Sequence, residues 1–197
     1  MPSTATVATV AGPNARRVQG LAPLDRRSTL CGPAATCSCA PADNFGLHRL
    51  VASAPAASVL VCDAGGDGDH GYFGDLLALE ARGRGHGGLV IDGAVRDSAA
   101  IRELGFPVFH RGTAPAQAAK SGGGSVGETI EIGGVAVAQG DVVVADGDAV
   151  LVVAAAHWPD VAERAEALEA REQEIRAALE RGERLGDLLG LDLGGGT

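Results

Sequence analysis

Aromatic residues are scarce in this sequence, at only 3% of its 197 residues, and acidic residues outnumber basic ones to give a formal net charge of −9. Proteins that bind nucleic acids present basic patches and rings that stack on bases, so this composition argues against such a surface. No apolar run approaches the roughly eighteen residues of a membrane span, and the N-terminus lacks a basic and then apolar signal pattern. We therefore expect a soluble cytoplasmic protein that binds neither nucleic acid nor membrane.

Cysteine is also rare, with four residues in apolar, strand-like contexts: Cys31, Cys37, Cys39 and Cys62. Cys37 and Cys39 stand two apart and could bind a metal, but no second pair of Cys or His accompanies them at the spacing of a zinc site. Free cysteine is among the most buried residue types. The simpler interpretation of these cysteines is therefore buried free thiols.

What the sequence does contain is a hydrophobic content of 46%, enough for one core and one domain over residues 1–197. Its centre is the segment 59–112. Two β-branched runs, Val59–Cys62 and Leu89–Ile91, each end in an aspartate, and a helical pattern of Leu76, Leu77, Leu79 and Glu80 lies between them. Strand, helix and strand in about thirty residues predict a βαβ unit in an α/β fold. Such folds bind ligands at the carboxyl ends of their strands.

The other elements are expected from their local patterns. Helices are predicted at about 4–11, 45–51, 98–104, 159–181 and 185–189, followed by a glycine-rich tail. Strands are predicted at 28–39, 107–110, 128–132, 135–138, 142–145 and 149–153, the last four as a β-meander. The helix that begins the C-terminal extension (about 159–190) has an apolar stripe of Val161, Ala165, Leu168, Ile175 and Leu179.

Two glycine-rich segments match known ligand-binding patterns but lack the required context. Gly83–Gly88 fits G-x-G-x-x-G, yet a helix precedes it and a strand follows, the reverse of a dinucleotide site. Gly65–Asp69 is similar to a calcium-binding repeat, but a single copy cannot stack into a β-helix. We reject both interpretations.

Arg96 and Asp97 follow the second strand and offer a more specific signal. An arginine beside an aspartate can hold a carboxylate next to a metal ligand, or it can be a surface salt bridge with Asp97 as a helix cap. Gly74–Leu77 is likewise either a plain helix start or a set of free N–H groups that bind an anion. In the second case Asp75 would face the same pocket as Arg96. The residues alone therefore predict a small anionic ligand, with or without a metal.

Five blocks together resemble the RraA-like family: Gly74–Leu77, Gly88–Asp97, Pro107–Gly112, Gly133–Gly134 and Gly140–Asp146. The resemblance runs in order from about Thr4 to Asp192. The family includes metal-dependent aldolases that act on 4-hydroxy-4-methyl-2-oxoglutarate and 4-carboxy-4-hydroxy-2-oxoadipate. It also includes a regulator of ribonuclease E activity.

The resemblance implies an αββα sandwich of the swivelling β/β/α type, assembled as a homotrimer or hexamer. Carried over by position, the residues that would bind substrate are Gly74, Asp75, Leu76, Leu77 and Arg96, with Arg96 and Asp75 as catalytic groups. Asp97 would bind a divalent cation, Mg²⁺ or Mn²⁺. A glutamate from the neighbouring subunit, Glu172 or Glu174, would complete the site.

The implied reaction is the cleavage of 4-hydroxy-4-methyl-2-oxoglutarate-type 2-oxo acids to pyruvate, through an enolate that the metal stabilises. Oxaloacetate decarboxylation would share that site as a secondary activity. The only lysine, Lys120, lies outside the central loops, which disfavours a Schiff-base aldolase.

One position departs from the aldolase pattern. Aldolase members carry Asp or Glu three residues after the metal-binding aspartate, where this chain has Ala100, and regulator-type members lack that carboxylate too. The alternative prediction is therefore a non-catalytic regulator that binds and inhibits a ribonuclease.

Overall fold

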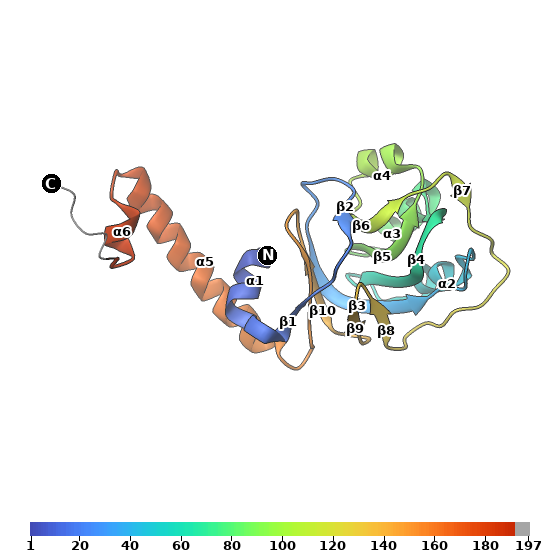
Figure 1. The fold of residues 1–197 in the computed structure, drawn as a ribbon, viewed down its shortest axis with the longest axis horizontal. Coiled ribbons are helices and arrows are strands. Elements are labelled where there is room, and N and C mark those ends of the chain that lie inside the picture. The colour runs from blue at the N-terminus through green and yellow to red at the C-terminus, as the bar shows by residue number, and fades with distance from the viewer. Residues whose placement is uncertain (192–197) are drawn as a thin grey trace.

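The computed structural model describes residues 1–191 as a layered α/β structure (Figure 1). The glycine-rich tail, including Asp192 at the end of the family resemblance, lies outside the described residues. Helices α2 (Phe45–Ser53), α3 (Asp75–Gly83) and α4 (Ser98–Leu104) cover one side of the strands, while α1 (Thr4–Ala11) and α5 (Trp158–Glu180) cover the other.

One sheet forms the frame of the molecule, with strand order β1-β11-β10-β3-β4-β5-β6-β2 and β7 paired to β4. Its strands are β1 (Ala15–Arg17), β2 (Ala22–Pro23), β3 (Leu30–Ser38), β4 (Val59–Phe73), β5 (Gly88–Val95), β6 (Val108–Thr113), β7 (Ala116–Gln117), β10 (Val142–Ala145) and β11 (Val150–Val153). Strands β3 to β6 are parallel neighbours, whereas β10 and β11 run antiparallel. A separate hairpin joins β8 (Ile130–Ile132) to β9 (Val135–Val137). A 3-10 turn (Gly12–Asn14) follows α1, and α6 (Leu185–Leu188) follows α5.

Successive side chains on these strands point to opposite faces of the sheet and pack into two different hydrophobic layers. Leu89 and Ile91 on β5 pack under α2–α4, while Val90 between them faces the second strand layer. On β10, Val143 faces that same inner layer and Val144 faces α1 and α5. A strand that is buried on both faces has a continuous run of apolar residues in its sequence, and β5 and β10 have such runs. The predicted αββα class is confirmed.

Two expectations about strands were wrong in detail. The β-branched run was expected to end at Cys62, but β4 continues through the Gly- and Asp-rich segment to Phe73 and pairs with β5 across three register shifts. Bulges of this kind re-aim side chains and are common beside functional sites. The predicted meander also divides, because β8–β9 forms its own hairpin while β10–β11 joins the edge of β3.

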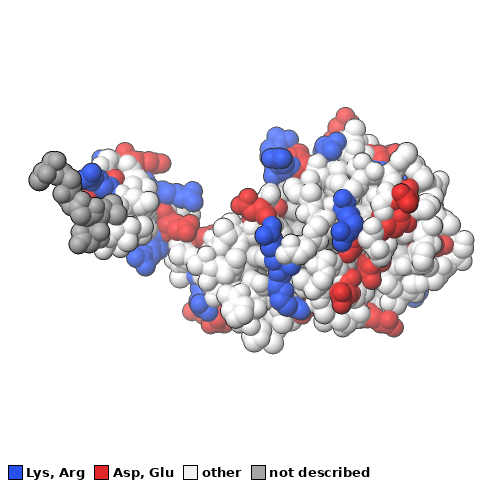
Figure 2. Space-filling view, viewed as in Figure 1, with Lys and Arg blue, Asp and Glu red and all other residues white. Residues whose placement is uncertain are grey.

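Helix α5 projects away from the sandwich (Figure 1). Its inner residues Val161 and Ala165 are buried, as the predicted stripe requires, but Leu179 near its outer end is 38% exposed. Acidic and basic side chains are interspersed along it in Figure 2. On this helix Asp160 and Arg164, four residues apart, form an ion pair of 3.3 Å. No helix within residues 1–191 has the length and apolar character needed to cross a membrane.

Candidate functional site

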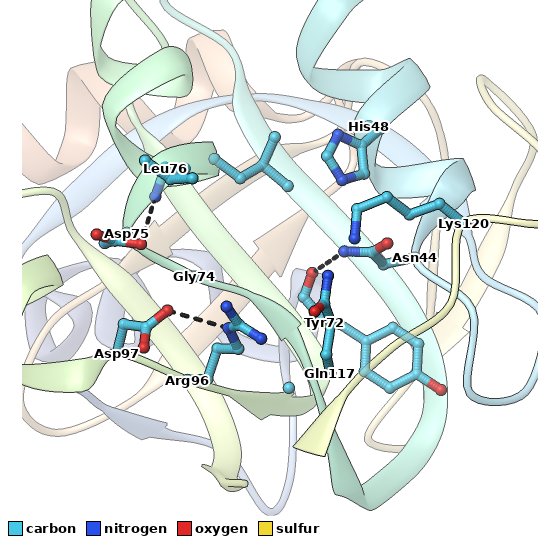
Figure 3. A pocket seen from close by; sticks show the side chains of 12 residues that line it. Asn44, His48, Tyr72, Gly74, Asp75, Leu76, Arg96, Asp97, Gln117 and Lys120 are labelled. Atoms are coloured by element: carbon cyan, nitrogen blue, oxygen red, sulfur yellow. Dashed lines mark hydrogen bonds and ion pairs between the residues drawn. The ribbon is translucent and has the colours of Figure 1, made fainter. Parts of the chain in front are cut away.

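The carboxyl ends of β4 and β5 meet at a pocket of about 160 Å³ (Figure 3). β4 passes through Gly74 into α3, and β5 passes through Arg96 and Asp97 into α4. The backbone N–H of Arg96 donates to the carbonyl oxygen of Phe73 at 2.9 Å and holds the two exits together. The lining consists of Asn44, His48, Gly71, Tyr72, Gly74, Asp75, Leu76, Leu77, Arg96, Asp97, Gln117 and Lys120.

Arg96 and Asp97 form an ion pair on the pocket wall. Nε of Arg96 donates to Oδ2 of Asp97 at 3.0 Å, and both side chains are about one third exposed (33% and 39%). Asp97 occupies the left-handed backbone region, with φ of 52°, an unusual conformation that clusters at functional sites. It stands at the N-cap position of α4, but its side chain makes no capping hydrogen bond. The alternative of a salt bridge with Asp97 at the helix cap therefore holds for the ion pair and for the cap position, but the Asp97 carboxylate does not cap the helix and lines the pocket instead.

Two glycines leave the space in which this pair lies. A β-carbon at Gly71 would be 2.7 Å from Cβ of Arg96, and one at Gly74 would be 2.8 Å from Oδ2 of Asp97. Real β-carbons do not approach other atoms so closely. The backbone of β4 and of the α3 start therefore forms a close-fitting support for the ion pair.

The start of α3 contributes a second carboxylate to the same pocket. Oδ1 of Asp75, which lines the pocket, accepts the backbone N–H of Leu76 at 2.8 Å, and Oδ2 makes no hydrogen bond within the described residues. Asp75 also lies in the first turn of α3, where a helix favours negative charge. The structure thus places Asp75, Arg96 and Asp97 together in one pocket, as expected from the sequence.

The opposite wall carries polar groups that sequence reasoning did not find. His48 comes from α2, Lys120 and Gln117 come from the segment after β6, and they face the acidic wall in Figure 3. Burial and the nearby charge of Lys120 lower the pKa of His48, so its ring is mostly neutral at neutral pH. These residues lie far apart in the sequence and share no motif, so no local signal could have grouped them.

Asn44 stands at the N-cap position of α2, but its side chain makes no capping hydrogen bond. Its Nδ2 donates to the carbonyl oxygen of Tyr72 at 2.7 Å, while its buried Oδ1 has no partner among the described residues. Buried polar atoms are nearly always hydrogen-bonded in native proteins. An unpaired acceptor on a pocket wall is therefore consistent with a ligand or water at this position.

Three sequence-predicted positions lie outside this pocket. Glu172 and Glu174 are on α5, which extends away from the sandwich, and Glu172 pairs with Arg176 at 3.8 Å on the same helix. Ala100 is exposed on the first turns of α4 and is not part of the pocket lining.

Asp92, which opens the Asp92–Asp97 segment, has a structural role. Its buried carboxylate accepts the guanidinium of Arg111 and the backbone N–H of Gly133, the latter at 3.0 Å. Burial alone would raise the pKa of Asp92, but these two hydrogen bonds prevail and lower it. Asp92 therefore ties β5 to β6 and to the β8–β9 turn.

The donor atoms of the pocket fit a hard divalent cation. Asp97 and Asp75 each have one carboxylate oxygen engaged and one available, and Mg²⁺ binds through one or two carboxylates while keeping several waters. No group of three His, Cys, Asp or Glu ligands converges at this pocket within residues 1–191, so a closed cage of protein ligands does not form there. Asp97 could hold such an ion through its available oxygen, with substrate and water completing the coordination.

Comparisons with known proteins identify the relatives of this fold. A relative from Halalkalibacterium halodurans, provisionally named 4-hydroxy-4-methyl-2-oxoglutarate aldolase, is 34% identical over 80% of this chain and 75% of its own length. A Marinomonas protein with the same provisional name is 37% identical over 59% of this chain and 71% of its own. The structure of RraAS2 from Streptomyces coelicolor, described as an unusual member of the RNase ES inhibitor RraA family, is 28% identical. Its TM-score is 0.75, with 89% of this chain and 90% of that one covered.

The model of the RraA-like family, described as Aldolase/RraA, matches residues 4–152. That span contains all twelve residues of the pocket lining, from Asn44 to Lys120, and every strand of the sandwich except the last residue of β11. On this match, and on the arrangement of strands and pocket described above, the chain belongs to the RraA-like family.

Proposed function

We propose that this chain is a divalent-metal-dependent lyase that cleaves 4-hydroxy-4-methyl-2-oxoglutarate-type 2-oxo acids to pyruvate. The observation that carries the proposal is the Arg96–Asp97 pair, which faces Asp75 across the start of α3 in one small pocket. The provisional names of the two sequence relatives support the same reaction.

Arg96 is the group that binds the substrate's first carboxylate. Its Nε is engaged by Asp97, which fixes the plane of the guanidinium and leaves the terminal nitrogens for an anion. The N–H groups in the first turn of α3 that Asp75 does not engage favour negative charge at the same place. Because the whole chain has a net charge of −9, these local donors must outweigh its repulsion of an anionic substrate.

Asp97 is the residue that would hold the cation, through the carboxylate oxygen that Arg96 does not engage. When bound, a divalent cation supplies Lewis-acid stabilisation of the negative charge that develops on the keto oxygen as the carbon–carbon bond breaks. We assign to Asp75 the acceptance of the proton from the substrate's 4-hydroxyl group, directly or through water.

The opposite wall suits the rest of the substrate. Lys120 and His48 lie across the pocket from Asp75, where a cationic amine and a hydrogen-bonding ring fit a second carboxylate. Oxaloacetate also has two carboxylates and yields the same pyruvate enolate when carbon dioxide leaves. We therefore include oxaloacetate decarboxylation as a secondary activity.

We further propose that the protein assembles as a homotrimer or hexamer. Leu76 lines the pocket and is 77% exposed in the isolated chain. Leu179 on α5, Leu185 on α6 and Leu189 just after α6 are also exposed. Large exposed apolar side chains favour contact with a second copy, and Leu76 puts one such contact at the pocket. Light scattering at micromolar concentration should return a multiple of the chain mass, whereas a stable monomer of 19.7 kDa would contradict this assembly.

The second candidate function is a non-catalytic regulator that binds a ribonuclease. Ala100, in place of the aldolase carboxylate, and the likeness to Streptomyces coelicolor RraAS2 favour it. The two candidates separate in one experiment. Pyruvate release from 4-hydroxy-4-methyl-2-oxoglutarate and from oxaloacetate is measured with Mg²⁺ and then with EDTA, beside ribonuclease inhibition by the same preparation. EDTA-sensitive pyruvate release supports the lyase, and inhibition without any release supports the regulator.

A further inference from the structure

Three of the four cysteines converge at one point in the core beneath α2. Cys37 on β3 and Cys62 on β4 are register partners in the parallel pair, and Cys39 lies two residues further on the same side. Their three sulfurs all lie within 4.8 Å of one another, and Sγ of Cys39 is 3.6 Å from Sγ of Cys62. We propose that Cys37, Cys39 and Cys62 form a binding site for one soft monovalent cation, Cu(I), distinct from the carboxylate pocket.

The separations of the sulfurs fit a shared metal ion. Because every pair of sulfurs is within 4.8 Å, some point lies within about 2.8 Å (4.8/√3) of all three, whereas a metal–sulfur bond measures about 2.3 Å. Shifts of about half an ångström per side chain would therefore close a three-coordinate site. Three sulfurs around such an ion would stand about 4 Å apart (2.3 × √3), close to the 3.6 Å between Cys39 and Cys62.

The ligand set selects the class of ion. All three donors are sulfur, and soft thiolate ligands favour Cu(I) over the hard cations that carboxylates bind. A structural zinc site takes four ligands, but no fourth Cys, His, Asp or Glu joins the group in the described part of the chain. The same shortfall argues against an iron–sulfur cluster, which is usually held by four cysteines.

The three sulfurs differ in their access to solvent, so an ion could reach the site from one side only. Cys37 and Cys62 are fully buried, while Cys39 is only partly buried and offers the route of entry. A β-carbon at Gly46 would lie 2.3 Å from the carbonyl oxygen of Ser38 and 3.5 Å from Sγ of Cys39, so this glycine lets α2 begin directly over the sulfurs.

Binding requires no change of oxidation state. Hydrogen bonds from Cys37 and Cys62, with the backbone N–H of Leu47, lower the pKa of the Cys39 thiol. Hydrogen bonding within the group and burial raise the pKa values of Cys37 and Cys62. One Cu(I) ion would bind all three sulfurs as thiolates: three copper–sulfur bonds form, and the proton that each thiol carries is released to water.

Cys31 provides a matched control on the same strand. It packs on the α1 and α5 side of β3 and belongs to a different hydrophobic cluster from the other three cysteines. The reduced, metal-free protein is titrated anaerobically with Cu(I) in the presence of a competing chelator. We expect wild type and Cys31→Ser to retain one Cu(I) per chain and to gain thermal stability, because a ligand that binds only the native state stabilises it. Cys37→Ser and Cys62→Ser should lose both effects.

A second measurement on the wild-type chain guards against variants that fail to fold. Bound Cu(I) should protect Cys39, the partly exposed member of the group, from alkylation and leave Cys31 reactive, as mapped by peptide mass. Failure of the reduced wild type to retain Cu(I) would overturn the proposal. So would equal alkylation of Cys39 with and without the ion, or a Cys62→Ser variant that still binds one equivalent.

Discussion

A β-carbon on Gly74 would lie 2.8 Å from Oδ2 of Asp97, so the backbone at the start of α3 is in direct contact with the carboxylate on the neighbouring strand exit. The same β-carbon would be 3.2 Å from Nε of Arg96. The missing side chain at Gly74 therefore allows the ion pair to lie against the helix start, where both can reach one ligand. Gly74 is therefore more than the residue before a helix, because its lack of a side chain leaves room for the Arg96–Asp97 pair.

Gly74→Ala should disturb the pocket without unfolding the protein. The φ of Gly74 is −126°, which alanine adopts readily, so the cost falls on Asp97 and Arg96, which must move. We expect kcat/KM for pyruvate release to fall by ~10–100-fold, the usual effect of displacing support around a metal ligand. Gly83→Ala, at the other end of α3 with open space around it, is the matched control and should leave activity unchanged. Equal activity of the two variants would contradict this role of Gly74.

Lys120→Met should weaken binding of substrates with two carboxylates more than binding of pyruvate. Lys120 lies across the pocket from Arg96, so its charge is expected to act on the far carboxylate only. A hydrogen bond to a charged group contributes ~1.5–3 kcal/mol, so KM for 4-hydroxy-4-methyl-2-oxoglutarate should rise by ~10–100-fold. Inhibition by pyruvate should change little, and Lys120→Arg should restore most of the affinity. An equal loss of affinity for the substrate and for pyruvate would mean that Lys120 does not act on the far carboxylate alone.

Asp92 should make stability depend on acid pH. Its folded-state pKa is lowered by Arg111 and Gly133 in spite of burial, so its carboxylate stabilises the fold above the unfolded pKa of about 4. As the pH falls below about 4, this stabilisation decreases, and it is lost once the pH has passed below the lower pKa of the folded state. Asp92→Asn should cost ~1–3 kcal/mol at neutral pH and flatten the acid decline in urea unfolding curves. Asp69→Asn, at an exposed position on β4, is the control. A decline in Asp92→Asn as steep as in wild type would assign the acid sensitivity to other carboxylates.

Much of the site could be predicted from local sequence. The β-branched run before Asp92 is typical of a buried strand, and the leucine spacing after Gly74 is typical of a helix. These two patterns correctly predicted β5 and α3, which extend a few residues beyond them. Because the carboxyl ends of parallel strands meet at one sheet edge, Arg96, Asp97 and Asp75 had to lie near one another. The resemblance to a known family supplied their expected roles, which local physics alone left open.

The remaining features depend on contacts that no local pattern encodes. Lys120 and His48 reach the pocket only through the tertiary arrangement of α2 and the segment after β6. The convergence of Cys62 with Cys37 depends on the register of two parallel strands, which their spacing in the sequence does not reveal. The long β4 was missed because its Gly- and Asp-rich half has turn composition, yet the neighbouring β5 and β7 supply partners that keep it extended.

Ala100 separates the two candidate functions. It is exposed one turn of α4 beyond Asp97, so a carboxylate at this position could reach a water on the pocket cation, whereas a methyl group cannot. We expect both the aldolase and the decarboxylase activity of wild type to be weak but measurable, and an increase of ~10–100-fold in metal affinity or activity for Ala100→Asp or Ala100→Glu. Rates against Mg²⁺ concentration provide the test. Superimposable curves for variant and wild type would mean that the missing carboxylate is not limiting.

The Mg²⁺ dependence of pyruvate release in wild type and in Asp97→Asn tests the central claim most directly. Asparagine tolerates the left-handed backbone of position 97, where φ is 52°, so the variant should fold while losing the negative charge. We predict saturable, EDTA-sensitive release of pyruvate from oxaloacetate by wild type and by the control Asp69→Asn, and no Mg²⁺-dependent release by a folded Asp97→Asn. Full Mg²⁺-dependent activity in Asp97→Asn would contradict the assignment of the metal to this carboxylate.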